Sequence, residues 1–234
     1  MKRAVIAAGG TGGHFYPGLV TARELRRRGW ECLFLVRRED PSGAKLRGED
    51  FPYVEVDLRG LPRALNLELV KFPFKLAGSL RLVDRVVRDF KPDLAVGMGG
   101  YLTFPLAAAA RRRGMPAALH ESNSVLGLAN QASTWLGARV FWGLPPREGE
   151  GVVVGTPVRP ELLDAPSRED ARRRLGLKPE LPTILGFGGS QGAKALNEGV
   201  PLALRALKAP PQVLHLAGRG RSEEPARLYG ANPV

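Results

Sequence analysis

The stretch "AAGGTGGHFYPG" (residues 7–18) lies between a short apolar run and a segment with helical spacing. The apolar run, residues 4–8, is short and uninterrupted, which predicts a buried parallel strand. We expect Pro17 in the first turn of the following helix and Gly29 just past its end. The glycines therefore form a strand-to-helix turn, where the free N–H groups and the helix dipole would attract phosphate or another anion.

A dinucleotide-binding fold matches this turn only in part. Its fingerprint, G-x-G-x-x-G, is met by Gly10 and Gly12 but requires a third glycine where Phe15 stands. The next apolar run ends in Arg37 and Arg38, which could bind the 2′-phosphate of NADP. An NADP-linked oxidoreductase is therefore one alternative, and a purely structural tight turn is another.

The composition is that of a globular, basic chain. Its 234 residues suffice for one large domain or two small ones, and the single cysteine, Cys32, cannot form an intrachain disulfide, so we expect a cytoplasmic protein. No apolar run approaches the ~20 residues that span a bilayer. The formal net charge of +12 indicates an acidic partner, such as nucleic acid, anionic lipid or a phosphorylated substrate. Basic and aromatic residues are not interleaved, so we expect no nucleic-acid partner.

The pattern of strand, glycine loop and helix recurs along the chain. It begins again at residue 93, in "DLAVGMGGY", and at residue 183, in "TILGFGGSQGAKALNEG". Strands that alternate with helices in this way predict an α/β protein with doubly wound parallel sheets.

A proline-rich segment separates the second and third of these patterns. It contains a short helix that Ser167 and Asp170 would cap and that Gly176 would end. We therefore expect two Rossmann-like domains, residues 1–156 and 157–234. The second is shorter than the ~100 residues that a doubly wound domain needs, so we expect it to be incomplete.

Five motifs together resemble a known family. They are "GGTGGHFYPG" (9–18), "GMGGY" (97–101), "HESNSVLGLAN" (120–130), "GTPVR" (155–159) and "GGSQGAKALN" (188–197). In this order, with a basic and apolar segment near residue 70, they closely resemble the MurG family of N-acetylglucosaminyltransferases over essentially the whole chain. The resemblance implies the GT-B fold, in which an N-terminal domain holds a lipid-linked acceptor and a C-terminal domain holds the sugar nucleotide.

The resemblance also implies a reaction. Such enzymes transfer N-acetylglucosamine from UDP-N-acetylglucosamine to the 4-hydroxyl of N-acetylmuramic acid in undecaprenyl-linked lipid I, with inversion, and form lipid II for peptidoglycan synthesis. We expect no tightly bound cofactor, and no His, Cys and acidic cluster has metal-ligand spacing. Further donor-binding residues of the family would lie beyond residue 234, so a non-catalytic lipid-binding fragment stays an alternative.

The family motifs assign individual residues to the acceptor. His14 matches the histidine of the first loop, and the nearby helix start disfavours its cationic form, which suits a base that takes the proton of the acceptor hydroxyl. Contact with the acceptor diphosphate and a structural role are the alternatives for His14. The residues expected to bind the acceptor are Thr11, Gly12, Gly13, His14, Tyr101, Glu121 and Asn123.

A second set matches the donor site of the family. Arg159 would meet the diphosphate charge of the sugar nucleotide. We expect His120 and His215 to be structural. The residues expected to bind the donor are Thr11, Gly12, Gly13, Asn123, Arg159, Gly189, Ser190, Gln191 and Gly192.

The segment 66–88 mixes apolar and basic residues. Apolar side chains that enter the acyl boundary beside cationic ones would bind an anionic membrane surface, so the protein is expected at the cytoplasmic face of the cell membrane. The alternative is an ordinary amphipathic helix packed on the sheet, which we expect for Val83, Val86 and Val87. The predicted membrane patch comprises Leu69, Val70, Lys71, Phe72, Phe74, Lys75, Leu76, Leu80 and Arg81. The sequence leaves the oligomeric state open.

Overall fold

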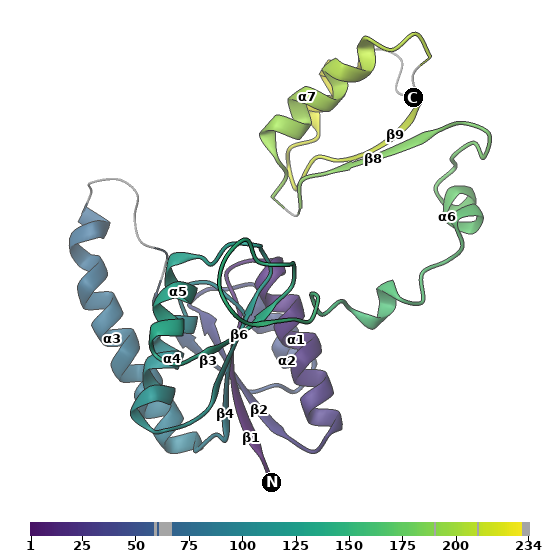
Figure 1. Ribbon diagram of the computed structural model, residues 1–234. Helices are drawn as coiled ribbons and strands as arrows, with labels where there is room; N and C mark the ends of the chain where they lie inside the picture. Colours follow the sequence, from purple (N-terminus) through teal and green to yellow (C-terminus); the bar gives the residue numbers. More distant parts are fainter. Residues whose placement is uncertain (59, 61–66, 190, 210, 231–234) are drawn as a thin grey trace. The chain divides into compact units, whose positions relative to one another are not determined.

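The computed structural model describes residues 1–58, 60, 67–189, 191–209 and 211–230 (Figure 1). Its internal contacts divide the chain into two compact units, unit 1 (Met1–Leu162) and unit 2 (Leu163–Val234). This division falls later than the boundary expected after residue 156. As a result, Arg159 of the "GTPVR" motif lies in unit 1 rather than in the unit that holds the third glycine loop.

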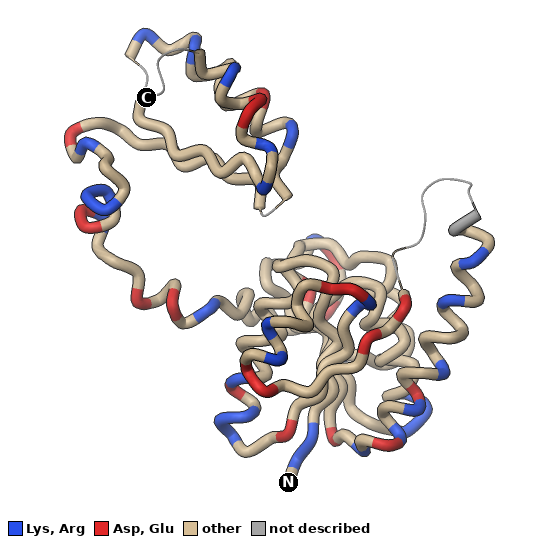
Figure 2. The backbone as a smooth tube through the Cα atoms, turned by 180° about the vertical axis from the view of Figure 1, so that it is seen from behind, with Lys and Arg blue, Asp and Glu red and all other residues tan. Residues whose placement is uncertain are grey.

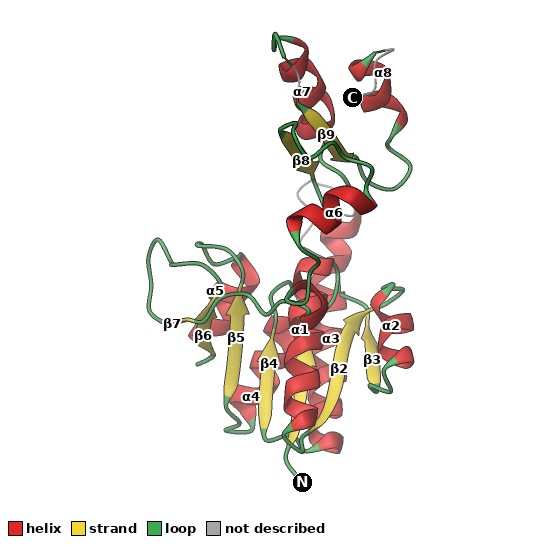
Figure 3. Cartoon of the chain, turned by 90° about the vertical axis from the view of Figure 1, so that its right-hand side faces the viewer, coloured by secondary structure: helices red, strands yellow, loops and turns green. Residues whose placement is uncertain are grey.

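Unit 1 is built on a parallel sheet of seven strands in the order β3-β2-β1-β4-β5-β6-β7. Each neighbouring pair is parallel, and Figure 3 shows the arrowheads pointing the same way. The strands are β1 (Arg3–Ala7), β2 (Glu31–Arg37), β3 (Tyr53–Val56), β4 (Leu94–Gly97), β5 (Ala117–Glu121), β6 (Arg139–Trp142) and β7 (Val152–Val153). The doubly wound α/β fold expected from the alternating pattern is confirmed.

Helices cover both faces of this sheet. They are α1 (Gly12–Arg27), α2 (Ser42–Gly48), α3 (Leu67–Phe90), α4 (Thr103–Arg112) and α5 (Leu128–Trp135), with a short 3-10 turn, η1 (Pro160–Leu162). Successive residues of β1 and β2 point to opposite faces, as the pleat requires, and each face forms its own core. The sheet is therefore buried on both sides, which is typical of parallel sheets.

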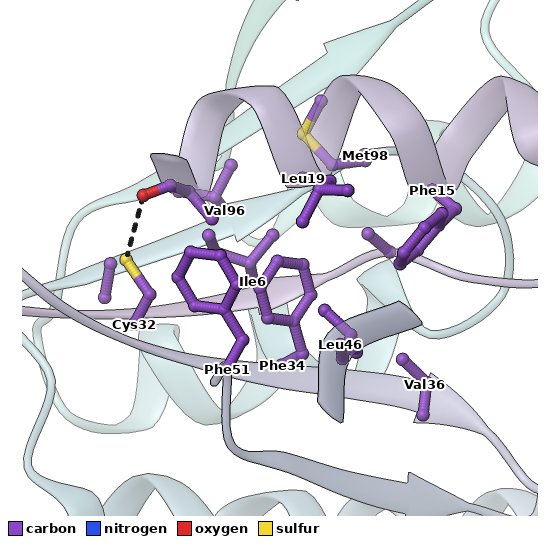
Figure 4. Close-up of a cluster of buried hydrophobic side chains, with 13 residues drawn as sticks. Ile6, Phe15, Leu19, Cys32, Phe34, Val36, Leu46, Phe51, Val96 and Met98 are labelled. Carbon is purple, nitrogen blue, oxygen red and sulfur yellow. Dashed lines mark hydrogen bonds between the residues drawn. The ribbon is translucent and has the colours of Figure 1, made fainter. Parts of the chain in front are cut away.

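Figure 4 shows the core between the sheet and the helices α1 and α2. Phe34 of β2 is fully buried there and meets Phe51 edge to face, with ring centroids 5.4 Å apart. Cys32 lies in the same core, directs its thiol to the carbonyl of Ala22, and has a pKa that burial raises to about 11. Cys32 is therefore a small buried side chain of this core.

The strand order fixes where a ligand site can form. The chain moves from β1 to one side of the sheet through β2 and β3, and then crosses back through α3 to β4 on the other side of β1. The carboxyl ends of β1 and β4 therefore flank a topological switch point. Open α/β sheets bind their ligands in the crevice at such a point.

The described residues of unit 2 form one parallel pair of strands and three helices. These elements are α6 (Arg168–Arg174), β8 (Thr183–Phe187), α7 (Lys194–Arg205), β9 (Gln212–Leu216) and α8 (Glu223–Tyr229). The cap of α6 is as predicted: the Ser167 hydroxyl accepts a hydrogen bond from the Asp170 N–H at 3.1 Å, and Gly176 follows the helix with φ +68°. The pairing of β8 with β9 confirms the third strand, glycine loop and helix pattern.

One local expectation about a helix was wrong, and one helix was not predicted. Helix α1 already begins at Gly12, so Pro17 lies inside it rather than in its first turn. The start is shifted because the extended backbone of Thr11, with φ −148° and ψ 158°, lets the glycines after it adopt helical geometry. The exposed charged run after residue 222 forms helix α8, which was not predicted, with Glu223 and Glu224 in its first turn, where acidic residues interact favourably with the helix dipole.

Helix α3 carries the predicted membrane patch, and the structure narrows that patch. Phe72 and Leu76 pack against the core on the α3 and α4 side of the sheet, as do Val83 and Val87, which are almost fully buried. Val70 and Phe74, one helical turn apart, expose 65% and 76% of their surface. Basic residues recur along α3, and Asp84 and Asp89 lie in its C-terminal half (Figure 2). Among the described residues, no helix is long and apolar enough to cross a membrane.

Candidate functional site

A cavity of about 270 Å³ opens at the switch point of unit 1. Its walls come from the β1–α1 turn, the end of β2, the segment after β3 and the β4–α4 turn. The lining residues are Gly9, Gly10, Thr11, His14, Arg37, Leu58, Gly60, Gly99, Gly100, Tyr101 and Leu102. The structure therefore brings together three residues that two motifs predicted for the acceptor: Thr11 and His14 of the first motif and Tyr101 of the second.

The glycine turn offers N–H groups at the start of α1. Among the described residues, nothing accepts a hydrogen bond from the N–H of Gly12 or Gly13, whereas the N–H groups of His14 and Phe15 are bonded to the Thr11 carbonyl. Two adjacent free N–H groups at a helix start attract an anionic oxygen. The predicted anion site is therefore smaller than the whole glycine loop.

Asp40 occupies another N–H group of the same turn. Its Oδ2 accepts a hydrogen bond from the Gly10 N–H at 2.6 Å, and its Oδ1 accepts from the Ser42 N–H and hydroxyl. Burial alone would raise the pKa of Asp40, but these hydrogen bonds and the charge of Arg37 lower it below the ordinary value. Asp40 therefore fixes the turn as an anion. Sequence reasoning missed it, although its place just after β2 was a usable signal.

His14 faces the cavity from the first turn of α1. Its Nδ1 lies 3.4 Å from the Thr11 hydroxyl, and its ring packs against Gly99 and Gly100. Burial lowers the pKa of His14, while Glu121 and a hydrogen bond to the Gly9 carbonyl oppose that effect. A neutral imidazole with a lowered pKa can accept a proton near neutral pH, as a general base must.

Gly99 and Gly100 are required for this arrangement. Their φ angles are +93° and +77°, which side chains rarely tolerate. A Cβ on Gly99 would also lie 3.0 Å from Nε2 and Cδ2 of His14. The glycines of the "GMGG" motif therefore leave the room that the His14 ring occupies.

Glu121 is not available to a sugar in the way that the family motif suggested. It is 4% exposed, and its Oε1 accepts hydrogen bonds from the N–H and Nδ2 of Asn123 at 3.0 and 2.9 Å. Its Oε2 accepts from Nδ2 of Asn130 at 2.7 Å and from the Gly127 N–H at 3.3 Å. Both oxygens are thus occupied inside the protein. Asn123 is exposed, and it is not among the residues that line the cavity. Asn130 was missed because nothing in its sequence context shows burial.

Two other predicted residues are placed outside the cavity. Arg159 stacks its guanidinium on the Tyr16 ring of α1, with its Cζ 4.5 Å from the centroid, and Lys45 lies over the same ring at 4.7 Å. His120 is buried and contacts the Gly155 carbonyl through Nε2 at 3.0 Å, which is the structural role expected for it.

The remaining donor residues lie in unit 2, in the turn between β8 and α7. Gly189 and Gly192 have φ angles of +78° and +69°, and a Cβ on Gly192 would come within 1.9 Å of the Ala217 carbonyl. Gln191 is exposed, and the prediction for Ser190 lies outside the described residues. A cavity of about 690 Å³ begins beside the first residue of α7 and is lined by Lys194, Asn197, Gly220, Arg221, Glu223, Glu224, Arg227 and Leu228.

His215 is hydrogen-bonded within unit 2. Its ring nitrogens meet the Tyr229 hydroxyl at 2.8 Å and Oδ1 of Asn197 at 3.1 Å. Among the described residues, no group of His, Cys, Asp and Glu could hold a metal ion.

The fold and the cavity define a class of protein: a doubly wound α/β domain with a cavity at its switch point, lined by the turn before a helix and by a histidine of that helix. The comparisons with known proteins then identify the family. Residues 4–142 match the model of the glycosyltransferase family 28 N-terminal domain, which covers more than half of the chain, and the chain belongs to this family.

Relatives in the same family carry a specific activity in their names. The chain is 39% identical to the UDP-N-acetylglucosamine--N-acetylmuramyl-(pentapeptide) pyrophosphoryl-undecaprenol N-acetylglucosamine transferase of Elusimicrobium minutum, over 93% of this chain and 62% of that protein. It is 41% identical to the enzyme of that name from Bordetella parapertussis, over 92% of this chain and 60% of the relative. The crystal structure of Acinetobacter baumannii MurG superposes with a TM-score of 0.75 at 30% identity and covers all of this chain.

The chain thus spans 60–65% of the length of these proteins. None of them supports the NADP-linked oxidoreductase. The site explains why, because Asp40 takes the Gly10 N–H and the buried Phe15 replaces the third glycine of the fingerprint.

Proposed function

We propose that this chain provides the acceptor-binding domain and part of the donor-binding domain of an N-acetylglucosaminyltransferase. The donor is UDP-N-acetylglucosamine, and the acceptor is the undecaprenyl-linked lipid I whose product is lipid II. The observation that carries the proposal is the cavity of unit 1, where Thr11, His14 and Tyr101 meet beside two free N–H groups of a helix start. The names of the relatives support it.

The proposed reaction uses residues of this chain in distinct roles. His14 takes the proton of the acceptor 4-hydroxyl, so that its oxygen forms a bond to C1 of the donor sugar as the bond from C1 to the UDP oxygen breaks. The electron pair of that broken bond leaves with UDP. The N–H groups of Gly12 and Gly13 would hold diphosphate charge, because preformed donors stabilise an anion without reorganisation. The reaction needs no tightly bound cofactor.

Arg159 is proposed to bind the donor diphosphate. A guanidinium stacked on an aromatic ring, as that of Arg159 is on Tyr16, can still donate hydrogen bonds in its own plane to phosphate oxygens. The unit 2 turn that contains Gly189, Gln191 and Gly192 is proposed, separately, to contact the donor.

Binding of a soluble lipid I analogue to the full 234-residue chain in mild detergent tests the acceptor site. We expect His14→Ala and Asn123→Ala to weaken binding by about tenfold each, which corresponds to the loss of one or two hydrogen bonds. The matched control is His215→Ala, which removes a histidine from unit 2 and should leave binding unchanged. Equal affinity of the wild type and His14→Ala, measured by calorimetry, would overturn the assignment of the cavity.

We propose further that the exposed face of α3 binds the cytoplasmic surface of an anionic membrane. Val70 and Phe74 supply apolar surface, and Lys71, Lys75 and Arg81 bring positive charge to the same helix. A soluble domain could reach a lipid-linked acceptor in this way.

Sedimentation with vesicles that contain phosphatidylglycerol tests this surface. Phe74→Ser should reduce the fraction of protein bound to the vesicles several-fold, because it removes the exposed ring that would enter the acyl boundary. Leu207→Ser removes a 48% exposed apolar residue of unit 2 and is the matched control. If both variants sediment like the wild type, α3 is not the membrane surface.

A further inference from the structure

The carboxylate of Glu121 is a buried charge with an unusual set of partners. All four of its hydrogen bonds come from neutral amide groups, those of Asn123, Gly127 and Asn130. Within the described part of the chain, no cation forms an ion pair with it. A charge removed from water at this cost is normally balanced by an opposite charge. Glu121 therefore lacks a permanent counter-ion.

His14 is the titratable group placed to serve as that counter-ion. A Cβ on Gly99 would lie 3.0 Å from Nε2 of His14 and 3.7 Å from Nδ2 of Asn130, so both groups border the space that Gly99 leaves empty. Asn130 in turn donates to Glu121 at 2.7 Å. The Asn130 amide therefore lies between the imidazole of His14 and the carboxylate of Glu121.

The Asn130 amide has an unused acceptor at this point. Asn130 is 3% exposed, and its Oδ1 is buried without a hydrogen-bond partner. Unpartnered buried polar atoms are costly and rare, and each requires an explanation. An N–H that His14 gains on protonation would add a donor beside the Asn130 amide, whose Nδ2 lies 3.7 Å from the position of a Cβ on Gly99.

We propose that Glu121, held by Asn130, is a positioning residue: a buried counter-charge that stabilises the imidazolium of His14. The inference rests on the proposed role of His14 as the base. When His14 takes the proton of the acceptor hydroxyl, the site changes from a buried anion to a buried ion pair separated by one amide. Glu121 thereby acts on the reaction without touching the sugar.

Other charged and titratable groups also face His14. His120 of β5 opposes its protonation, and Arg37 at the end of β2 and Tyr101 line the same cavity. Glu121 is the negative group among them, and it raises the pKa of His14 against the effect of burial.

The test is an NMR titration of the histidine rings in the full 234-residue chain, which requires neither donor nor acceptor. Glu121→Gln keeps the shape and the hydrogen-bonding capacity of the side chain but removes its charge. We expect the titration midpoint of His14 to fall by about one pH unit, the size expected for one charge at this distance in a partly buried site. Glu150→Gln removes an exposed charge from unit 1 and is the matched control, with no shift expected.

A second variant covers the case in which Glu121→Gln does not fold. The double variant Glu121→Gln/Asn130→Asp exchanges the amide and the carboxylate. It thereby moves the negative charge to position 130, which borders the His14 ring at Gly99. We expect the midpoint of His14 to rise above the wild-type value by about half a unit.

Two results would overturn the proposal: a His14 midpoint unchanged in folded Glu121→Gln, or an exchange variant with a midpoint no higher than the wild type. Either result concerns the counter-charge alone, because binding of the lipid I analogue tests the proposed function separately.

Discussion

The two units use the same local pattern but complete it to different degrees. In unit 1, helices cover both faces of the parallel sheet, and Phe34 is fully buried. In unit 2, α7 and α8 reach the face of the strand pair that carries His215. The other face leaves Leu185, Phe187 and Leu216 between 55% and 59% exposed. Parallel sheets are normally buried on both sides. We therefore expect the stability of each unit to depend on how many faces of its sheet are covered by helices, rather than on the local pattern of strand, glycine loop and helix.

The largest expected effect comes from separating the units. A fragment of residues 1–162 should unfold cooperatively on heating, because its core is closed on both faces of the sheet. A fragment of residues 163–234 should stay largely unfolded, because a core of this size rarely supplies more than about 3–5 kcal/mol even when it is complete. Calorimetry and circular dichroism decide the question. A cooperative transition of the second fragment at low concentration would contradict the comparison.

A matched pair of phenylalanines measures the same difference within the full chain. Phe34→Ala in unit 1 should lower the free energy of unfolding by about 3–5 kcal/mol, because it leaves a cavity in a closed core. Phe187→Ala in unit 2, which is 59% exposed, should cost less than about 1 kcal/mol. Urea unfolding followed by circular dichroism gives both values. Similar costs at the two positions would show that the face of Phe187 is covered in solution.

The glycine turns of the two units are stabilised by different contacts, and a substitution of Asp40 tests this difference. Unit 1 uses the Asp40 carboxylate on the Gly10 N–H, whereas unit 2 packs the backbone of Gly192 against Gly218. Asp40→Asn should lower the free energy of unfolding by about 1–2 kcal/mol at pH 7. Because the folded pKa of Asp40 lies below its ordinary value, this stabilisation is present above about pH 4 and is lost as the pH falls through the folded pKa.

The two proteins should therefore converge in stability at acidic pH. Glu148→Gln, an exposed position of unit 1, is the control and should follow the wild type at every pH. A constant difference between Asp40→Asn and the wild type down to pH 3 would contradict the electrostatic account of the turn.

The smallest expected effect concerns the helix caps of unit 2. Ser167→Ala removes the hydrogen bond that caps α6 and should destabilise that helix by about 1 kcal/mol. Ser222→Ala changes the equivalent position of α8, where the side chain makes no capping bond, and should have almost no effect. Amide hydrogen exchange resolved by residue measures each helix, and equal changes in the two would contradict the role of the Ser167 cap.

Much of the architecture could be predicted from the sequence, because short apolar runs and glycine turns carry local signals. The three patterns of strand, glycine loop and helix were predicted, and the motifs indicated the family. The start of α1 and the existence of α8 were not predicted. Pro17 and the charged run after residue 222 indicate only local preferences, which tertiary packing overrides.

The candidate site was predictable only where the motif residues themselves face the cavity, as Thr11, His14 and Tyr101 do. The partners of those residues were not, since Asp40 and Asn130 act across contacts between segments distant in sequence.

The sequence by itself determined the fold class, the family and the chemistry available at the glycine turn, since these depend on residue type and spacing along the chain. Only the tertiary structure decided which groups are buried, and burial sets their role. It makes Glu121 an internal anion, limits the exposed apolar surface described on α3 to Val70 and Phe74, and places Arg159 on Tyr16. Burial, charge balance and stacking depend on the neighbours that the fold brings together, which the order of residues does not specify.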